Sequence, residues 1–300
     1  MCGETAVIDD RRFLELLEVR ARRPELIVRS AAARARRPLL ADDGRTCIIA
    51  ADHPARAALK VGTDPLAMAR RRDLLQRLLV ALAQPGVDGV LATPDIIEDL
   101  MLLDALHGRV AIGSMNRGGL PGAAWELDDR FTAYDADAIA RGGLDGGKML
   151  LRLALNDPGT AATLEGCARA VSELAARKLV AMVEPLPACR EANGTVRISK
   201  EADELVRVIG VASGLGNTSA YTWLKVHVTD DMERVLEATT LPTLLLGGDP
   251  GDRPAEVFEG WKRALRIPQV RGLVAGRALL YPPDGDVAGA VATAARLVHG

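Results

Sequence analysis

Eight short apolar runs alternate with longer stretches of helical periodicity between residues 46 and 300, and this alternation predicts an α/β fold. Strands that alternate with helices form a parallel sheet, and eight such repeats in about 250 residues are typical of a (β/α)8 barrel, the TIM barrel. The first 45 residues follow another pattern. We therefore expect an N-terminal helical extension over residues 1–45 and a barrel domain over residues 46–300.

The extension carries nine arginines between residues 9 and 37, with acidic residues and scattered apolar positions among them. This pattern predicts helices that pack outside the barrel or against another copy of the chain. An RNA-binding arm is the alternative, but the interleaved acidic residues disfavour it.

The barrel elements follow in order from residue 46. A doubly wound open sheet is the main alternative, but the first strand is followed by neither a GxGxxG fingerprint nor a Walker A motif. The glycine-rich stretch 116–143 is irregular, and no element is assigned to it. The predicted strands span residues 46–52, 89–93, 109–115, 147–155, 178–184, 222–228, 242–247 and 272–276. The predicted helices span residues 64–83, 94–106, 157–177, 199–212, 230–238, 254–265 and 287–298.

Composition and charge exclude several classes of function. The formal net charge is −2, which argues against a nucleic-acid partner held by bulk positive charge. No apolar run reaches the roughly 18–20 residues needed to span a membrane. The first ten residues lack a basic stretch followed by an apolar one, so we do not expect a secretory signal there. The four cysteines show no CxxC spacing, so we expect reduced thiols in a cytoplasmic protein and no zinc site.

Only six of the 38 basic residues are lysines, and Lys225 lies in the middle of the predicted strand 222–228. Side chains alternate along a strand, so Trp223, Lys225 and His227 share one face, whereas the opposite face is wholly apolar. The apolar face is expected to pack on the helices, which turns Lys225 into the barrel. A shifted strand that leaves Lys225 on the surface is the alternative.

Three further ionisable side chains are expected in the same cavity. Lys148 lies on the polar face of strand 147–155, while Asp52 and Glu184 each end an apolar strand. Barrel enzymes hold their chemistry at these carboxyl ends. One acid alone is better explained as a helix cap or a structural ion pair, but four ionisable groups directed at one cavity indicate catalysis.

Two lysines beside two carboxylates suit imine chemistry. A lysine nucleophile must lose its proton, and burial together with a neighbouring cation lowers its pKa. Carboxylates are needed to move protons to and from the carbinolamine and the substrate hydroxyl. We therefore assign Lys225 as nucleophile, Lys148 as the perturbing cation, and Glu184 and Asp52 as proton-transfer groups.

These motifs resemble the class I (Schiff-base) aldolases, in particular the archaeal-type fructose-bisphosphate and the tagatose-bisphosphate aldolases. Asp52-His53 is similar to the motif that ends their first strand, and Leu224-Lys225-Val226 is similar to the strand of their imine-forming lysine. The tagatose enzymes also carry a lysine as in Lys148-Met149, and a glutamate at the position of Glu184. The archaeal-type enzymes place a tyrosine acid at that position.

The last two strands resemble the phosphate grip of the same enzymes. Glycines let backbone N–H groups approach a phosphate, and an arginine adds a charge-assisted contact. The resemblance implies a phosphorylated sugar as substrate, no cofactor, no metal and a homo-oligomer. The expected substrate-binding residues are His53, Trp223, His227, Gly247, Gly248, Gly276 and Arg277.

A related group of barrel proteins belongs to bacterial inositol breakdown. That resemblance implies cleavage of 2-deoxy-5-keto-gluconate 6-phosphate to dihydroxyacetone phosphate and malonate semialdehyde. Departures from the archaeal-type pattern, such as Pro54 after the Asp-His pair and Leu246 before the Gly-Gly turn, bear on the substrate more than on the imine.

Three rival functions remain open at this stage. A zinc-dependent aldolase needs a histidine-rich ligand set, and only His53 and His227 of the four histidines are plausible ligands. A related barrel thiolase would transfer an acyl group from a phosphorylated dione to coenzyme A. A sugar-phosphate sensor on the same scaffold would catalyse nothing. Asn116 and Arg117 are explained equally well as substrate contacts or as parts of a glycine-rich turn.

Overall fold

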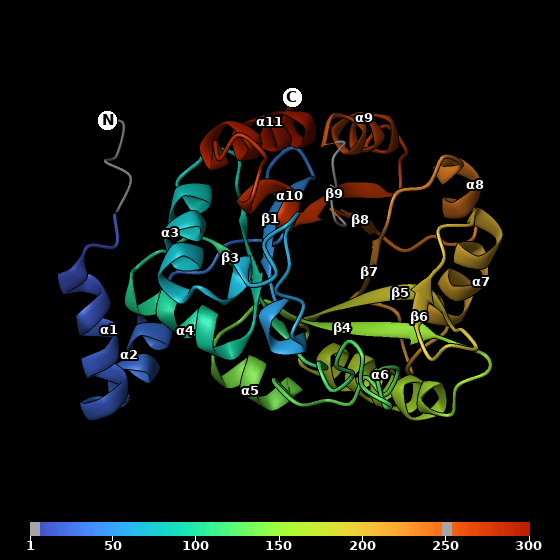
Figure 1. Ribbon diagram of the computed structural model, residues 1–300, viewed down its shortest axis with the longest axis horizontal. Coiled ribbons are helices and arrows are strands. Elements are labelled where there is room, and N and C mark those ends of the chain that lie inside the picture. The colour runs from blue at the N-terminus through green and yellow to red at the C-terminus, as the bar shows by residue number, and fades with distance from the viewer. Residues whose placement is uncertain (1–6, 248–253) are drawn as a thin grey trace.

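Eight parallel strands close into a barrel in the computed structural model, which describes residues 7–247 and 254–300 (Figure 1). Each barrel strand pairs with the next one along the chain, including β4 with β5, and pairing of the last strand β9 with the first strand β1 closes the ring. The predicted (β/α)8 barrel is therefore confirmed. The barrel strands are β1 (Thr46–Ala51), β2 (Gly89–Ala92), β3 (Val110–Ser114), β4 (Gly146–Leu153), β5 (Val180–Arg190), β7 (Thr222–Val226), β8 (Thr243–Leu246) and β9 (Val270–Ala275).

Helices surround the barrel, and the larger apolar cluster lies between them and the outer face of the strands. A second, smaller cluster that includes Ile48, Met182 and Leu244 fills the barrel interior. This interior packing closes the barrel beneath its C-terminal end, where the site lies. The surrounding elements are η1 (Pro54–Arg56), η2 (Ala67–Ala69), α3 (Arg71–Leu82), α4 (Pro94–Leu102), α5 (Ala136–Arg141), α6 (Gly159–Ala176), α7 (Ala202–Ser213), α8 (Met232–Leu236), α9 (Pro254–Ala264), α10 (Arg277–Leu280) and α11 (Val287–His299).

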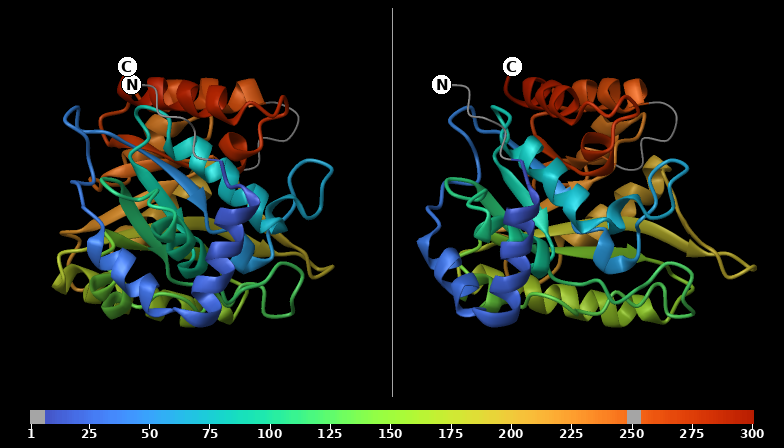
Figure 2. Two further views of the ribbon diagram at one scale, coloured as in Figure 1. Left: turned by 90° about the vertical axis from the view of Figure 1, so that its left-hand side faces the viewer. Right: turned by 60° about the vertical axis from the view of Figure 1, so that its left-hand side comes forward.

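The sequence prediction ends the fifth strand at Glu184, whereas β5 continues to Arg190. Pro185 and Pro187 lack a backbone N–H and indicate a strand end, yet they still lie opposite residues of β4. Beyond them the chain turns back as β6 (Val196–Ile198), which pairs antiparallel with β5. The resulting hairpin projects beyond the barrel (Figure 2). We refer to residues 185–200 as the hairpin arm.

The N-terminal extension forms α1 (Asp10–Arg22) and α2 (Glu25–Ala33), beside α4 at one side of the barrel. Its arginines contact groups at the N-terminal ends of the strands. Arg34, with a side chain 2% exposed, donates to the carbonyl of Arg109 at 2.6 Å and lies 3.2 Å from Asp145 Oδ2. Arg37 pairs with Asp88 at 2.5 Å. In the described ranges, no helix is both long and apolar enough to cross a membrane.

Candidate active site

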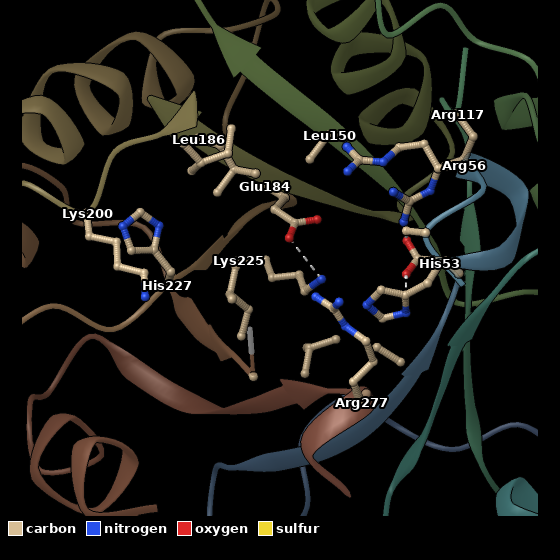
Figure 3. A pocket seen from close by; sticks show the side chains of 18 residues that line it. His53, Arg56, Arg117, Leu150, Glu184, Leu186, Lys200, Lys225, His227 and Arg277 are labelled. Atoms are coloured by element: carbon tan, nitrogen blue, oxygen red, sulfur yellow. Dashed lines mark hydrogen bonds and ion pairs between the residues drawn. The ribbon is translucent and has the colours of Figure 1, made fainter. Parts of the chain in front are cut away.

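A cavity of about 280 Å³ opens at the C-terminal ends of the barrel strands (Figure 3). This is the face where TIM-barrel enzymes place their catalytic groups, because the loops after the strands converge there. Its charged lining residues come from six different connections and strands. They are Asp52, Arg56, Arg117, Glu184, Lys200, Lys225 and Arg277.

Lys225 on β7 faces this cavity. Its neighbours Leu224 and Val226 are fully buried in the outer apolar cluster, so the alternation of the strand turns Lys225 inward. The ammonium Nζ donates to Glu184 Oε1 at 3.2 Å, and the residue is only 5% exposed. Figure 3 shows this pair near the centre of the site. Lys225 is thus a buried amine with access to a ligand.

Lys148 on β4 lies between the two carboxylates. Its Nζ donates to Asp52 Oδ2 at 3.3 Å and also contacts Glu184 Oε2. Lys148 is 1% exposed and, unlike Lys225, is absent from the cavity lining. It therefore acts as a bridge beneath the site, and Lys225 presents its amine to the cavity.

Arg117 supplies a third buried cation from the loop after β3. Its Nη2 contacts Asp52 Oδ2, and its Nε donates to Ser114 Oγ at 3.1 Å. The preceding Asn116 anchors the loop, because its side-chain amide accepts from and donates to the backbone of Leu150 at 2.6 Å each. The cluster thus combines three cationic side chains with two carboxylates.

Burial and the unequal number of charges shift the pKa values of the cluster. Burial lowers the pKa of Lys148 well below its usual range, and Arg117 lowers it further. Burial also lowers the pKa of Lys225, with Arg117 adding to the shift and Glu184 opposing it. Burial alone would raise the pKa of Glu184, but the three surrounding cations outweigh it and hold that pKa well below normal. The cluster therefore favours an ionised glutamate beside a lysine that readily loses its proton.

The groups of the expected phosphate grip lie together at another part of the cavity. Gly247, Gly276 and Arg277 all line it, after β8 and β9. A Cβ on Gly276 would lie 2.3 Å from the backbone oxygen of Ala50, so only glycine fits there. Gly248, the remaining member of the expected grip, lies outside the described residues.

Of the expected substrate contacts from histidine and tryptophan, two line the cavity and one does not. His53 lies with Nδ1 3.8 Å from Asp52 Oδ1, and burial together with Arg277 lowers its pKa. His227 also lines the cavity. Trp223 does not, because it lies at the start of β7 and packs against the apolar cluster inside the barrel. A substrate contact from Trp223 therefore stays a prediction, and Trp223 is not part of the cavity lining.

Sequence reasoning missed two cations of the site, Arg56 and Lys200. Arg56 lies in η1 just after Asp52-His53, a signal available in the sequence. Lys200 is one of only six lysines, but it reaches the cavity through the hairpin arm, which was not predicted. Among residues 7–247 and 254–300, no group of three or more His, Cys, Asp or Glu side chains is placed to hold a metal ion.

The fold is similar to that of archaeal fructose-bisphosphate aldolases. An archaeal fructose 1,6-bisphosphate aldolase matches with a TM-score of 0.66 and 17% identity, over 91% of this chain and 99% of that one. A second archaeal fructose-1,6-bisphosphate aldolase, with its catalytic lysine bound to the carbinolamine intermediate, matches with a TM-score of 0.65 and 16% identity, over 91% and 100%.

The chain belongs to the Cgl0159-like family, which matches residues 44–295. The crystal structure of Cgl0159 from Corynebacterium glutamicum is similar over 98% of both chains, with 50% identity and a TM-score of 0.95. No curated protein matches the chain.

Proposed function

We propose that this protein is a metal-independent class I aldolase that acts on a phosphorylated keto sugar or keto sugar acid through an imine on Lys225. The observation that carries the proposal is the position of Lys225, whose amine faces the cavity 3.2 Å from Glu184 Oε1 while Lys148 and Arg117 lie close by. The similar fold of an archaeal fructose-1,6-bisphosphate aldolase, whose catalytic lysine is bound to the carbinolamine intermediate, supports it.

Imine formation needs a neutral amine and a proton shuttle. The Lys225 amine attacks the ketone carbon, its nitrogen loses a proton, and the ketone oxygen gains one, which forms a carbinolamine. Loss of the hydroxyl as water then gives the protonated imine. Glu184 lies within hydrogen-bond distance of Nζ and is ionised, so it can first accept a proton from the Lys225 ammonium and release the neutral amine. The second nitrogen proton passes to the ketone oxygen when the carbinolamine forms, and Glu184 gives the first proton to the leaving hydroxyl.

The imine then serves as an electron sink. In the cleavage direction, a base removes the proton from the hydroxyl on the carbon β to the imine, the bond between the α and β carbons breaks, and its electron pair moves into the enamine. The aldehyde leaves, the enamine is protonated at the α carbon, and water hydrolyses the resulting imine. Asp52 is the proposed base for the hydroxyl, because it lines the cavity and is held in place by Lys148 and Arg117.

Lys225 is a better candidate for the nucleophile than Lys148, although burial lowers the pKa of Lys148 further. An attacking amine must reach a ketone carbon, and Lys148 is held between two carboxylates outside the cavity lining. In this proposal Lys148 holds both acids in position, and Arg117 is the nearby cation that lowers the pKa of Lys225.

The proposed substrate is 2-deoxy-5-keto-gluconate 6-phosphate, cleaved to dihydroxyacetone phosphate and malonate semialdehyde. The support is a cavity with a cradle for one phosphate at Gly247, Gly276 and Arg277, and with further cations for an acidic substrate. Backbone N–H groups beside glycines, together with an arginine, are typical of phosphate sites at this end of a barrel.

Borohydride trapping tests the proposal. The protein is incubated with dihydroxyacetone phosphate and borohydride, and peptide mass spectrometry locates the adduct. We expect an adduct on Lys225, none in Lys225→Met, and a rate about 10²–10⁴-fold lower in Glu184→Gln. An adduct on Lys148 would exchange the roles of the two lysines, and binding without any adduct would refute imine chemistry. Product analysis with coenzyme A separates aldol cleavage from acyl transfer.

A further inference from the structure

One lobe of the cavity remains unassigned by the imine mechanism and the phosphate cradle. It is formed by Lys200 and His227 together with Leu186 and Ile198, and we call these four residues the arm lobe. Three of them come from the hairpin arm, and His227 follows β7. In Figure 3, Lys200 and His227 lie on the opposite side of the Lys225–Glu184 pair from His53, Arg56 and Arg117.

His227 is the unusual member of the lobe. The residue is only 7% exposed, yet neither Nδ1 nor Nε2 has a hydrogen-bond partner within the described parts of the chain. Burial, with a contribution from Lys200, lowers its pKa to about 4, so the ring is neutral at physiological pH. A neutral imidazole has one N–H donor and one acceptor nitrogen. Buried polar groups are normally satisfied, so an unpaired ring that lines a cavity indicates a ligand.

Lys200 supplies the charge of the lobe. Across the ranges 7–247 and 254–300 it forms no ion pair or hydrogen bond, although its charge acts on His227. An ammonium beside a neutral N–H donor matches a single negative charge with two acceptor oxygens, as in a carboxylate. Leu186 and Ile198 add an apolar wall that suits the short carbon chain leading to such a group.

Arg56 is the competing cation for an acidic group, but its surroundings differ. The carboxylates of Asp129, Glu184 and Glu126 all act on Arg56, so that end of the cavity already contains negative charge. Among the residues that the structure describes, Glu184 is the one carboxylate that acts on His227 in the same way. A further anion is therefore better accommodated in the arm lobe.

We propose that the arm lobe is a carboxylate subsite, in which Lys200 and His227 bind the acid group of the aldehyde partner and so select semialdehyde acids over neutral aldehydes. This inference rests on the proposed aldolase function and assigns the specificity of its second substrate to the hairpin arm. No covalent step is added, because the subsite only binds.

The test compares two aldehydes of equal chain length in the full-length protein. The kcat/KM for condensation with dihydroxyacetone phosphate is measured for 3-oxopropanoate and for propanal, in wild type, Lys200→Met and Arg56→Met. Lys262→Met serves as the matched control, because Lys262 is an exposed lysine on α9, away from the cavity. We expect the preference for the acid to fall about tenfold in Lys200→Met alone, with an unchanged adduct on Lys225. Loss of the preference in Arg56→Met instead would overturn the assignment.

A binding measurement keeps the subsite testable even if no imine forms. The ring signals of His227, assigned by comparison with His227→Gln, are followed by NMR as propanoate or inorganic phosphate is added. If propanoate shifts these signals, and the affinity obtained from the titration falls about tenfold in Lys200→Met, the carboxylate subsite is supported. No shift with propanoate, or a response to phosphate alone, overturns it. Absence of an adduct on any lysine would instead refute the proposed function.

Discussion

Replacing Arg117 by methionine should shift the pH dependence of imine formation. Arg117 and Lys148 contact the same oxygen of Asp52, so their cationic nitrogens lie within about 6 Å of each other. At that distance and an effective dielectric constant of about 20, two unit charges repel by about 3 kcal/mol, which equals about two pKa units. Arg117 also lowers the pKa of Lys225, so its removal should raise that pKa and move the midpoint of imine formation upward by about one pH unit.

The direction of this pH shift follows from the reacting form of Lys225, which is the neutral amine. Arg117 is one of the causes that lower the pKa of Lys225, so its removal raises that pKa and reduces the neutral amine at a given pH about tenfold. The loss of Arg117 also leaves Asp52 paired with Lys148 alone, which further favours charged lysines. The acidic limb of the rate profile should therefore move about one pH unit upward, with the rate recovered at higher pH.

The assay is the rate of borohydride-trapped adduct on Lys225 between pH 5 and pH 10. Arg117→Lys serves as the matched control, since it keeps a cation in the loop and should leave the midpoint within a few tenths of a unit. Circular dichroism melting establishes that each variant is folded. An unchanged midpoint in Arg117→Met, or an equal shift in Arg117→Lys, would refute the electrostatic reasoning.

Three further outcomes follow from the structure. Gly276→Ala places a methyl group 2.3 Å from a backbone oxygen of β1, so calorimetry should show dihydroxyacetone phosphate binding at least tenfold weaker, whereas Gly210→Ala, with open space around its Cβ, should bind normally. His227 has a folded pKa of about 4 against 6.5 for an ordinary histidine, so unfolded chains bind more protons between those values. The free energy of unfolding in urea should therefore fall by up to about 3 kcal/mol from pH 6.5 to pH 4, and this pH dependence should be smaller in His227→Gln. Arg34→Met leaves the carbonyls of Arg109 and Gly143 without this donor, and Asp145 keeps only Arg36 and the backbone N–H of Ala111. The loss should lower stability by about 3 kcal/mol and Tm by roughly 5–10 °C in calorimetry, and an unchanged Tm would mean that the extension does not stabilise the barrel.

The alternation of strands and helices, and with it the barrel, could be predicted from the sequence alone. The sequence also determined the direction of Lys225, because strand geometry turns alternate residues to opposite faces and the face of Leu224 and Val226 is wholly apolar. The same local rule placed Asp52 directly after β1, whereas Glu184 lies within β5, which continues beyond the strand end that the sequence predicts. These features depend on residues that are close together in the chain, so the local sequence is sufficient to predict them.

The way in which these groups converge could not be predicted from the sequence, because it depends on how the barrel closes. Asp52 and Lys148 are 96 residues apart, and closure of the barrel brings them within 3.3 Å. Closure also determined that Lys225 reaches the cavity while Lys148 lies beneath it, and that Arg117 joins them. Sequence analysis left Arg117 open between a substrate contact and a turn, because a loop conformation depends on contacts such as that of Asn116 with Leu150. The hairpin arm was missed because Pro185 and Pro187 indicate a strand end, whereas pairing with β4 carries the strand past them.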